Sequence, residues 1–212
     1  MQANTETKTL RTGGQDRDRI RKLTVTAMLS AVAFVLMFLD FPLPMIMPSF
    51  VQMDFSDLPE LLGAFALGPV YGVLVALIKN LIHLLLAGST NGVGELCNFL
   101  LGASFAWVAG FVYQRNKTRR GAVLGAVLGA VVMGIFSVPL NFFLTYPAYV
   151  VLYGMPMDVI LGMYKAILPS VDSLLECLVI FNMPWTLAKG LLDAALCMLI
   201  YKPLSPILHG RH

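Results

Sequence analysis

The sequence predicts an all-α integral membrane protein, a single bundle of about six transmembrane helices with both termini in the cytoplasm. Hydrophobic residues make up 58% of the 212 residues and charged residues 13%, whereas soluble domains average about 25% charged. Apolar runs longer than a strand or a core helix recur along nearly the whole chain. The few charges cluster at the ends of these runs, where charge decides topology.

The polar amino-terminal segment precedes the membrane domain. Residues 1–19 contain no signal-peptide core, so we expect a disordered cytoplasmic tail, followed by a six-helix membrane domain over residues 20–212. The first helix is predicted over residues 21–39, which is close to the ~20 residues that a span requires. Arginines and Lys22 at its start place the amino terminus inside by the positive-inside rule.

Three prolines, at positions 42, 44 and 48, interrupt the chain after this helix. Proline fixes φ and lacks an amide donor, so residues 40–50 are predicted to form an irregular outer loop. The loop is unusually apolar. Phe41, Met45, Met47 and Phe50 offer aromatic and thioether surface that can cover a flat ring, although core packing is the commoner fate of such residues.

The apolar stretch over residues 57–87 can form one helix or two. A single helix would place the basic cluster at residues 115–120 outside, whereas a break at Gly68-Pro69 places that cluster in the cytoplasm. Proline disfavours helix at the residue before it, so we predict the break. The first piece, residues 57–67, is about half a normal span and has to tilt or thin the bilayer.

The remaining segments follow from this topology. We predict spans over residues 69–86, 93–113, 121–146 and a last span that ends near Tyr201. Between the final two lies a long outer segment with an interfacial helix around residues 158–167. The start of the last span is open, because residues 171–181 can also form a re-entrant segment before Pro184.

Polar residues within the apolar runs need an explanation, because each ionisable group costs about 2.5–3.5 kcal/mol to insert. With this topology most of them gather at the outer half of the bundle, as a pocket open to the outside requires. They are Lys79, Asn80, His83, Glu95, Asn98, Asn141, Tyr146, Asn182, Thr186 and Lys189. For any single member a structural role is equally reasonable, and Lys79 and Glu95 can form an internal ion pair.

Lys189 is the sharpest member of this set. It follows Pro184 by about a turn and a half, too deep to reach the surface easily, so its ammonium needs an acceptor such as a ligand carbonyl. Asn141 and Thr186 both donate and accept hydrogen bonds, which suits the edge of a heterocycle.

Small residues four apart invite close helix approach in lipid. Ala27 and Ala31 in the first helix are the better candidates for a partner, whereas the ridge of Gly121, Gly125 and Gly129 in the fifth helix favours internal packing.

Several function classes are excluded. The net charge of +3 forms no stripe for nucleic acid, and the three cysteines lie in apolar runs without metal-ligand spacing. The sequence lacks the Walker A, HExxH and GxSxG motifs, so we expect neither ATP hydrolysis nor enzyme activity, and no cofactor or metal.

Four stretches resemble the riboflavin-specific substrate-binding subunits (S-components) of energy-coupling factor (ECF) vitamin transporters. These are Ala27-x-x-x-Ala31, residues 54–62 (DFSDLPELL) with 68–72 (GPVYG), residues 94–99 (GELCNF) and residues 181–190 (FNMPWTLAKG). The likeness covers nearly all of the chain after the tail. The Asp-Leu-Pro and Gly-Pro pieces mark the superfamily, and the last two stretches look more specific to the riboflavin branch.

The resemblance implies a six-helix protein of a prokaryotic plasma membrane with both termini inside. Such proteins bind vitamin from outside beneath a first outer loop that acts as a gate. They associate with a scaffold subunit and two cytoplasmic ATPase subunits, and they are thought to topple in the membrane during transport. Ala27 and Ala31 would be the docking surface for the scaffold.

Carried over to this sequence, the resemblance implies that Lys189 and Asn141 hydrogen-bond to the polar edge of the isoalloxazine ring. Thr186 stands where some relatives have asparagine, and Glu95 and Asn98 would take the ribityl hydroxyls. Lys79 belongs to the same predicted set of polar ligand contacts. Riboflavin is then a transported ligand rather than a cofactor, and the loop over residues 40–52 would close on it.

Two kinds of alternative remain. One is an S-component for another vitamin, such as thiamine, folate or a biotin-like compound. The other is a stand-alone secondary transporter or channel, which should show an internal repeat or midplane charge pairs; the sequence contains no evident repeat. An intramembrane enzyme is disfavoured because no nucleophile constellation is visible.

Overall fold

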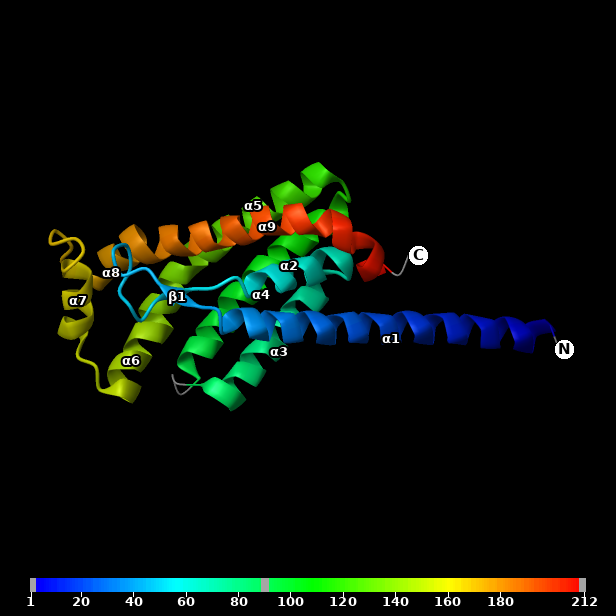
Figure 1. The fold of residues 1–212 in the computed structure, drawn as a ribbon, viewed down its shortest axis with the longest axis horizontal. Helices are drawn as coiled ribbons and strands as arrows, with labels where there is room; N and C mark the ends of the chain where they lie inside the picture. Colours follow the sequence, from blue (N-terminus) through cyan, green and yellow to red (C-terminus); the bar gives the residue numbers. More distant parts are fainter. Residues whose placement is uncertain (1–2, 89–91, 210–212) are drawn as a thin grey trace.

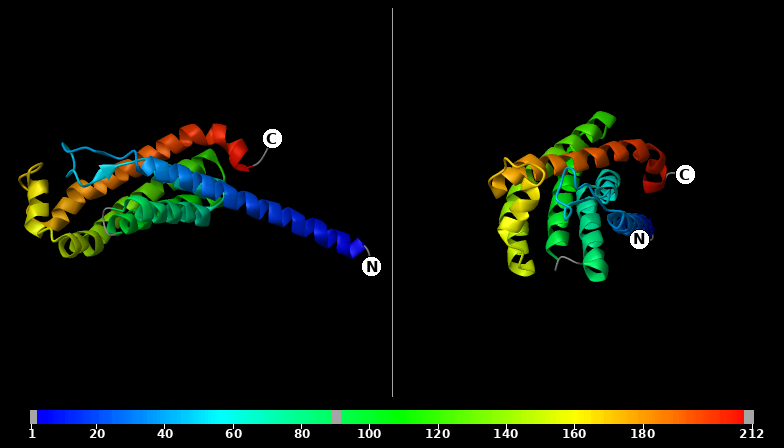
Figure 2. Two further views of the ribbon diagram at one scale, coloured as in Figure 1. Left: turned by 60° about the horizontal axis from the view of Figure 1, so that its bottom comes forward. Right: turned by 60° about the vertical axis from the view of Figure 1, so that its left-hand side comes forward.

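Long apolar helices dominate the fold, as the composition predicts. The computed structural model describes the backbone of residues 3–88 and 92–209, and the side chains of residues 16–88 and 92–201. The helices form an elongated bundle, and the two chain ends lie at the same end of it (Figure 1, Figure 2). Helix α1 (Ala3–Met37) runs well beyond the bundle at that end.

Helix α1 begins earlier than the sequence predicted. Residues 3–19, expected to be a disordered tail, continue the helix toward the amino terminus. Disorder was expected because the segment is polar. Its straight-chain Glu, Lys, Gln and Arg residues are nevertheless good helix formers. The cytoplasmic placement of this segment stays a prediction.

The proline-rich loop after α1 is irregular, as predicted, apart from a short antiparallel ribbon. Strand β1 (Phe41–Pro42) pairs with β2 (Gln52–Met53), with Phe41 opposite Met53. The ribbon brings the two ends of the loop together next to the carboxyl end of α1 (Figure 1).

The predicted break at Gly68-Pro69 is confirmed. Helix α2 (Asp57–Ala66) ends before Gly68, whose φ of 118° lies in the region that glycine adopts readily, and α3 (Pro69–Ala87) starts with proline in its first turn. Space also requires glycine at Gly72, because a Cβ there would lie 2.8 Å from the Ala64 side chain and 2.9 Å from that of Ala106. The short α2 therefore packs tightly between its neighbours.

Helices α4 (Val93–Arg115) and α5 (Arg119–Leu140) form a close antiparallel pair along the small-residue ridge. A Cβ at Gly125 would lie 2.6 Å from the Ala109 carbonyl oxygen, and one at Gly129 would lie 2.8 Å from that of Phe105. The prediction that this ridge packs internally is confirmed. The Thr118 hydroxyl caps α5 by accepting a hydrogen bond from the Gly121 amide at 3.0 Å.

Two π-helical segments extend the last two spans. Segment η1 (Asn141–Thr145) joins α5 to α6 (Tyr146–Tyr153), and η2 (Leu178–Asn182) joins α8 (Leu174–Cys177) to α9 (Met183–His209). Each π segment ends just before a proline, Pro147 or Pro184. The wider turn removes the clash that the proline ring would make with the preceding turn of an α-helix.

These segments correct two boundaries. The fifth span continues through Tyr153 rather than ending near Tyr146, and the last span begins at Leu174, so residues 171–181 do not form a re-entrant segment. Both errors came from reading proline as a helix end. The predicted interfacial helix is present as α7 (Met157–Lys165).

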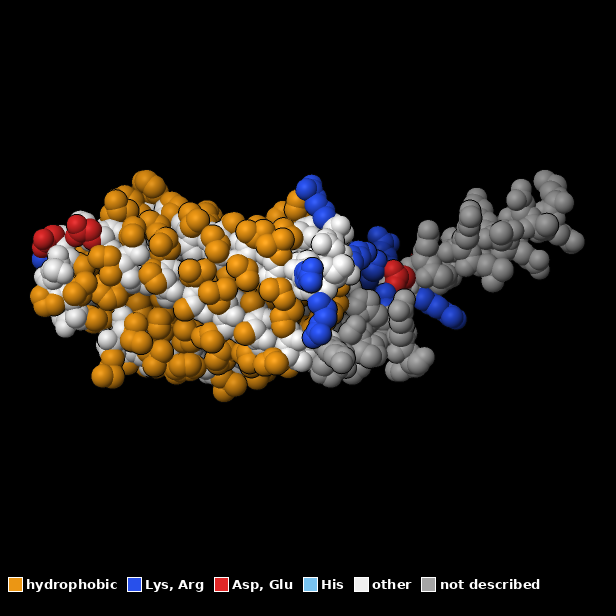
Figure 3. All heavy atoms as spheres, turned by 90° about the horizontal axis from the view of Figure 1, so that it is seen from above, with side chains coloured by type: hydrophobic (Ala, Val, Ile, Leu, Met, Phe, Trp, Pro, Cys, Tyr) orange, Lys and Arg blue, Asp and Glu red, His pale blue; other side chains and the backbone are white. Residues whose placement is uncertain are grey.

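The described residues contain five helical segments that are long and apolar enough to span a membrane, and the short α2 completes the bundle. The five are Asp16–Met37, Pro69–Ala87, Val93–Arg115, Arg119–Tyr153 and Leu174–Tyr201. Hydrophobic side chains cover the face of the bundle seen in Figure 3. Basic side chains gather at the end from which α1 extends, with an acidic side chain among them, and further acidic ones lie at the other end. The predicted all-α membrane bundle is confirmed.

Candidate ligand-binding cavity

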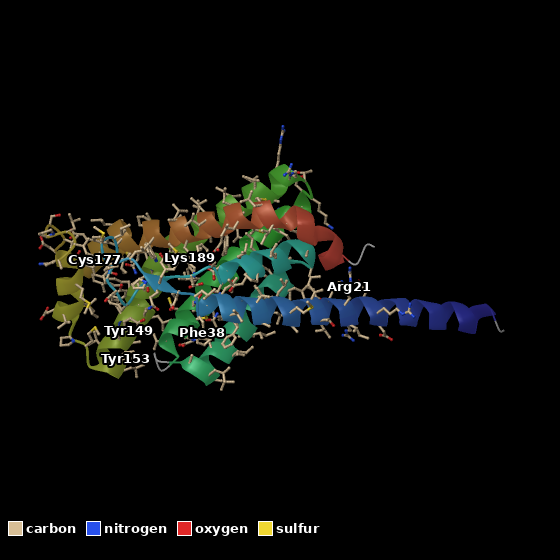
Figure 4. The ribbon with its side chains drawn as sticks, in the orientation of Figure 1. Arg21, Phe38, Tyr149, Tyr153, Cys177 and Lys189 are labelled. Atoms are coloured by element: carbon tan, nitrogen blue, oxygen red, sulfur yellow. The ribbon has the colours of Figure 1, made fainter. Side chains whose placement is uncertain are left out.

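A cavity of about 440 Å³ lies between the loop, α3, α4, η1, η2 and α9, a size typical of small-molecule sites. Its labelled wall residues Phe38, Tyr149 and Lys189 lie in the half of the bundle away from Arg21 and the chain ends (Figure 4). The larger apolar and aromatic side chains that line it are Met37, Phe38, Phe50, Val51, Leu101, Met133, Tyr146, Tyr149 and Trp185. The polar side chains that line it are Asp40, Gln52, Asp54, Asp57, His83, Glu95, Asn98, Asn141, Thr145, Asn182, Thr186 and Lys189.

Most of the predicted ligand-contact residues meet at this cavity, although they come from distant parts of the sequence. The residues that line it are Lys189, Asn141, Thr186, Asn98, Glu95 and Phe50. Four others of the predicted set do not line it, namely Lys79, Phe41, Met45 and Met47. The set therefore divides into a group on the cavity wall and a group held elsewhere.

Lys189 reaches the cavity wall from α9 and already has acceptors within the protein. Its Nζ lies 3.0 Å from Asp54 Oδ2 and 3.1 Å from Asp57 Oδ2. Its side chain is 13% exposed, and Lys189 lines the cavity. The ammonium is thus oriented by two carboxylates in a side chain that stays accessible from the cavity.

Lys79 lies in a closed cluster beneath the cavity. Its Nζ donates to Ser56 Oγ at 2.6 Å and to Asp57 Oδ1 at 2.8 Å, and it lies 2.5 Å from Glu60 Oε1. The Lys79 side chain is fully buried, so it contacts no solvent and no cavity. The alternative pairing of Lys79 with Glu95 does not form.

Glu95 instead pairs with a histidine at the rim of the cavity. His83 Nδ1 lies 2.9 Å from Glu95 Oε1, and the His83 ring also contacts Phe38 with centroids 5.4 Å apart. This contact joins α1, α3 and α4 at one side of the cavity, and it holds the Glu95 carboxylate against the wall.

Asn141 occupies the first position of η1. Its Nδ2 donates to the Ser137 carbonyl oxygen at 2.8 Å, and the Cys97 thiol lies 3.9 Å from its Oδ1. The amide nitrogen is therefore anchored to α5. The amide oxygen, with only a weak thiol donor beside it, can accept a stronger hydrogen bond.

The loop residues differ from one another in exposure. Met47 is buried in a small cluster with Met53 and Trp185, and the Trp185 ring lines the cavity. The rings of Phe41 and Phe55 lie 6.3 Å apart, and Met45 is 90% exposed. Met47 thus anchors the loop on α9, whereas Met45 has no packing role in this conformation.

A hydrogen-bonded group of three side chains lies at one side of the cavity. Tyr146 and Asn182 line the cavity, and both hydrogen-bond to Tyr164 of α7. The Phe50 ring lies against both tyrosines, with centroids 6.3 and 6.4 Å away. The sequence analysis placed Tyr146 and Asn182 among the outer polar residues but did not connect them with Tyr164.

The candidate docking residues lie on the outer face of α1. Ala27 and Ala31 are both exposed on the surface of the bundle, whereas Ser30 and Ala33 on the other face are buried. A flat surface of small side chains there is available to another helix, and its use as a docking surface stays a prediction.

The sequence did not point to Asp54, Asp57 and Glu60 as site residues, nor to the cavity-lining residues Tyr149 and Trp185. The three acidic residues lie in the Asp-Phe-Ser-Asp-Leu-Pro-Glu stretch, and acidic residues are common in the first turn of a helix. A signal was available in the unpaired positive charge. Two lysines in apolar helices require carboxylates at the same depth in the membrane, and this stretch, at the start of a short helix, supplies them.

Comparison with known proteins agrees with this architecture. Residues 21–201 match the family described as "ECF transporter, substrate-specific component". The chain is 34% identical over 189 residues to "Riboflavin transporter RibU" of Staphylococcus aureus (strain TCH60), covering 89% of this chain and 92% of the relative. It is 32% identical over 191 residues to "Riboflavin transporter FmnP" of Bacillus subtilis (strain 168), covering 89% and 94%.

The fold is also similar to that of a solved protein. The structure described under "Structure and mechanism of the S component of a bacterial ECF transporter" superposes with a TM-score of 0.69 at 34% identity. The match covers 90% of this chain and 98% of the other. Together with the spans, these findings identify a multi-pass protein of the prokaryotic plasma membrane in a transporter family rather than an enzyme class. This chain belongs to the substrate-specific components, or S-components, of ECF transporters.

Proposed function

We propose that this chain is the riboflavin-binding subunit of an ECF transporter. It captures riboflavin from outside and passes it inward when a coupling module hydrolyses ATP. The observation that carries the proposal is the cavity, which combines aromatic walls with a charged and amide-rich wall around Lys189. Its relatives over about nine-tenths of the chain are named riboflavin transporters.

The cavity suits the chemistry of a flavin. The isoalloxazine ring is flat and apolar on its faces, and Phe50, Tyr149 and Trp185 supply aromatic surface for those faces. Its polar edge carries carbonyl acceptors beside an imide N–H. Lys189 donates to a carbonyl, and Asn141 accepts from the imide through its amide oxygen.

The remaining polar wall suits the sugar-like chain of the ligand. Glu95 and Asn98 lie on neighbouring turns of α4 and can accept from and donate to the ribityl hydroxyls. Thr186, one turn before Lys189, adds a hydroxyl at the ring edge. Lys79 acts indirectly in this scheme, since it fixes Asp57, which in turn orients Lys189.

The loop over residues 40–52 acts as the gate. The β1–β2 ribbon ties the ends of the loop to each other, and Met47 anchors the loop on Trp185 of α9. The exposed side chains of Phe41 and Met45 turn onto the ring when the ligand enters. Binding from outside requires that the basic end of the bundle faces the cytoplasm, as the positive-inside rule predicts for both termini.

Transport requires partners, since the chain contains no ATP-binding motif. The partners are a membrane scaffold subunit and two cytoplasmic ATPase subunits, and the exposed Ala27 and Ala31 of α1 form the docking surface for the scaffold. Membrane lipid surrounds the rest of the bundle. The chain itself catalyses no reaction.

The test is an absorbance spectrum of the detergent-purified protein, followed by titration with riboflavin and measurement of flavin fluorescence quenching. We expect saturable tight binding with one riboflavin per chain, and no competition from thiamine or biotin. A colourless protein that leaves riboflavin fluorescence unchanged would overturn the proposal and move the assignment to another vitamin.

A further inference from the structure

Tyr164 is fully buried although it lies on α7, a nine-residue helix outside the membrane spans. It does not line the cavity. Its hydroxyl donates to Asn182 Oδ1 at 2.6 Å, and Asn182 Nδ2 donates to the Tyr146 hydroxyl at 3.2 Å. The two tyrosine hydroxyls are also hydrogen-bonded to each other. The three side chains therefore form a closed ring of hydrogen bonds.

The direction of each hydrogen bond in this ring follows from the donor count. Asn182 Oδ1 is only an acceptor, so the Tyr164 proton is committed to it. The hydroxyl–hydroxyl bond must then be donated by Tyr146. Tyr146 in turn accepts from Asn182 Nδ2, so each member donates once and accepts once within the ring. Burial raises the pKa of the Tyr164 hydroxyl, which keeps it a neutral donor.

The ring holds the Asn182 side chain in place. Turning the amide over would require all three hydrogen bonds to reverse together, and the reversed ring would be equally satisfied. In either sense the amide contacts both tyrosine hydroxyls, and Asn182 lines the cavity. Asn182 is therefore held at the cavity wall.

The backbone supports the same arrangement. Asn182 is the last residue of η2, and Tyr146 directly follows η1, so both sit where a π segment turns the helix. Such segments frequently occur at functional sites. Phe50 of the loop packs edge-on against the rings of Tyr146 and Tyr164, which places the ring of hydrogen bonds directly beneath the gate.

We infer that Tyr164 is a positioning residue for the ligand: through its hydrogen bonds to Asn182 and Tyr146 it holds both side chains in place at the cavity wall, where the Asn182 amide hydrogen-bonds to the ligand. The inference deepens the proposed function and rests on it. It also gives α7 a role, since the outer helix supplies the hydroxyl that orders two walls of the cavity.

A double-mutant cycle tests the inference by riboflavin titration of four proteins: parent, Tyr164→Phe, Asn182→Ala and the double variant. We expect Tyr164→Phe to weaken riboflavin binding by about fivefold to tenfold, at the upper end of what one hydrogen bond contributes. In the Asn182→Ala background the same change should weaken binding by less than about twofold, because no amide remains to be held in place.

Two controls separate this effect from damage to the fold. Tyr153→Phe removes a hydroxyl from an exposed tyrosine at the same end of the bundle and should leave riboflavin affinity at the parent value. Thermal unfolding and gel filtration report whether each variant is folded. A Tyr164→Phe protein with parent affinity, or effects that simply multiply in the double variant, would overturn the inference. A parent protein that ignores riboflavin would instead overturn the proposed function.

Discussion

Lys79 and Lys189 are two buried lysines that share one carboxylate, yet their surroundings differ. Asp57 accepts from Lys79 through Oδ1 and pairs with Lys189 through Oδ2. Around Lys79 the remaining partners, Ser56 and Glu60, complete the enclosure. Around Lys189 the enclosure is incomplete: its side chain is partly exposed and lines the cavity.

The difference separates a lysine that is fully enclosed from one that stays accessible to a ligand. A buried ion pair with every donor satisfied contributes to the fold but has nothing left for a ligand. A lysine held by carboxylates on one side and open on the other is oriented in advance, so little ordering is needed when a ligand binds. Residue type alone cannot make this distinction. It depends on whether protein groups surround the lysine completely or leave part of it accessible.

The largest expected effect is on stability, from Lys79→Met. The change leaves Asp57 and Glu60 buried near each other without Lys79, and breaking such a pair typically costs about 3–5 kcal/mol. Thermal unfolding in detergent without riboflavin should show a large fall in Tm. Lys117→Met, at an exposed position between α4 and α5, is the control. A Lys79→Met protein that unfolds with the parent would contradict the structural role.

The second effect is expected from Asp57→Asn, which touches both lysines. The uncharged amide weakens both ion pairs, so we expect a smaller fall in Tm than for Lys79→Met, together with riboflavin binding weakened by about tenfold. Unfolding and riboflavin titration of the same preparation measure both. Asp158→Asn, on the exposed surface of α7, should change neither. A change in only one property would show that Asp57 does not bridge the two regions.

A smaller effect is expected from Asp54→Asn, because Asp54 pairs directly with Lys189 and reaches Lys79 only through Ser56. Lys189 loses one of its two charged acceptors, and we expect riboflavin binding to weaken by about twofold to tenfold, since a hydrogen bond is worth about 0.5–1.5 kcal/mol. The Tm should fall less than for Asp57→Asn. The opposite ranking of the two Tm values would place Asp54 in the structural cluster.

The smallest effect on the purified protein is expected from Ala31→Leu, on the exposed face of α1 and outside both lysine regions. Riboflavin affinity and Tm should match the parent, whereas riboflavin uptake by cells that express the whole transporter should fail. Val127→Leu, exposed on α5, should leave uptake intact. Normal uptake with Ala31→Leu would remove this face as the docking surface.

The spans and their order could be predicted from the sequence, because apolar length and the positions of charges are local properties. The break at Gly68-Pro69 followed from two arguments. Proline disfavours helix at the residue before it, and the break places the basic cluster at residues 115–120 on the cytoplasmic side. The prolines at 147 and 184 misled the prediction of helix ends, since a π turn can accommodate proline and leaves no clear mark in the sequence.

The candidate site was only partly predictable. Polar residues in apolar helices identified Lys189, Asn141 and Thr186, because the cost of burying them is visible in the sequence. The partners were not visible: Lys189 pairs with Asp54 across 135 positions of chain, and Lys79 with Asp57 across 22. Which lysine is enclosed depends on those distant contacts.

Riboflavin titration of Lys189→Met, compared with the parent, tests the central claim most directly. The claim is that the open face of this ammonium binds the ligand, and a hydrogen bond to a charged group is worth about 1.5–3 kcal/mol. The predicted result is riboflavin affinity reduced by about 10- to 100-fold in a protein that still purifies as a folded species. Parent affinity in the Lys189→Met protein would contradict the assignment of this cavity wall as the binding site.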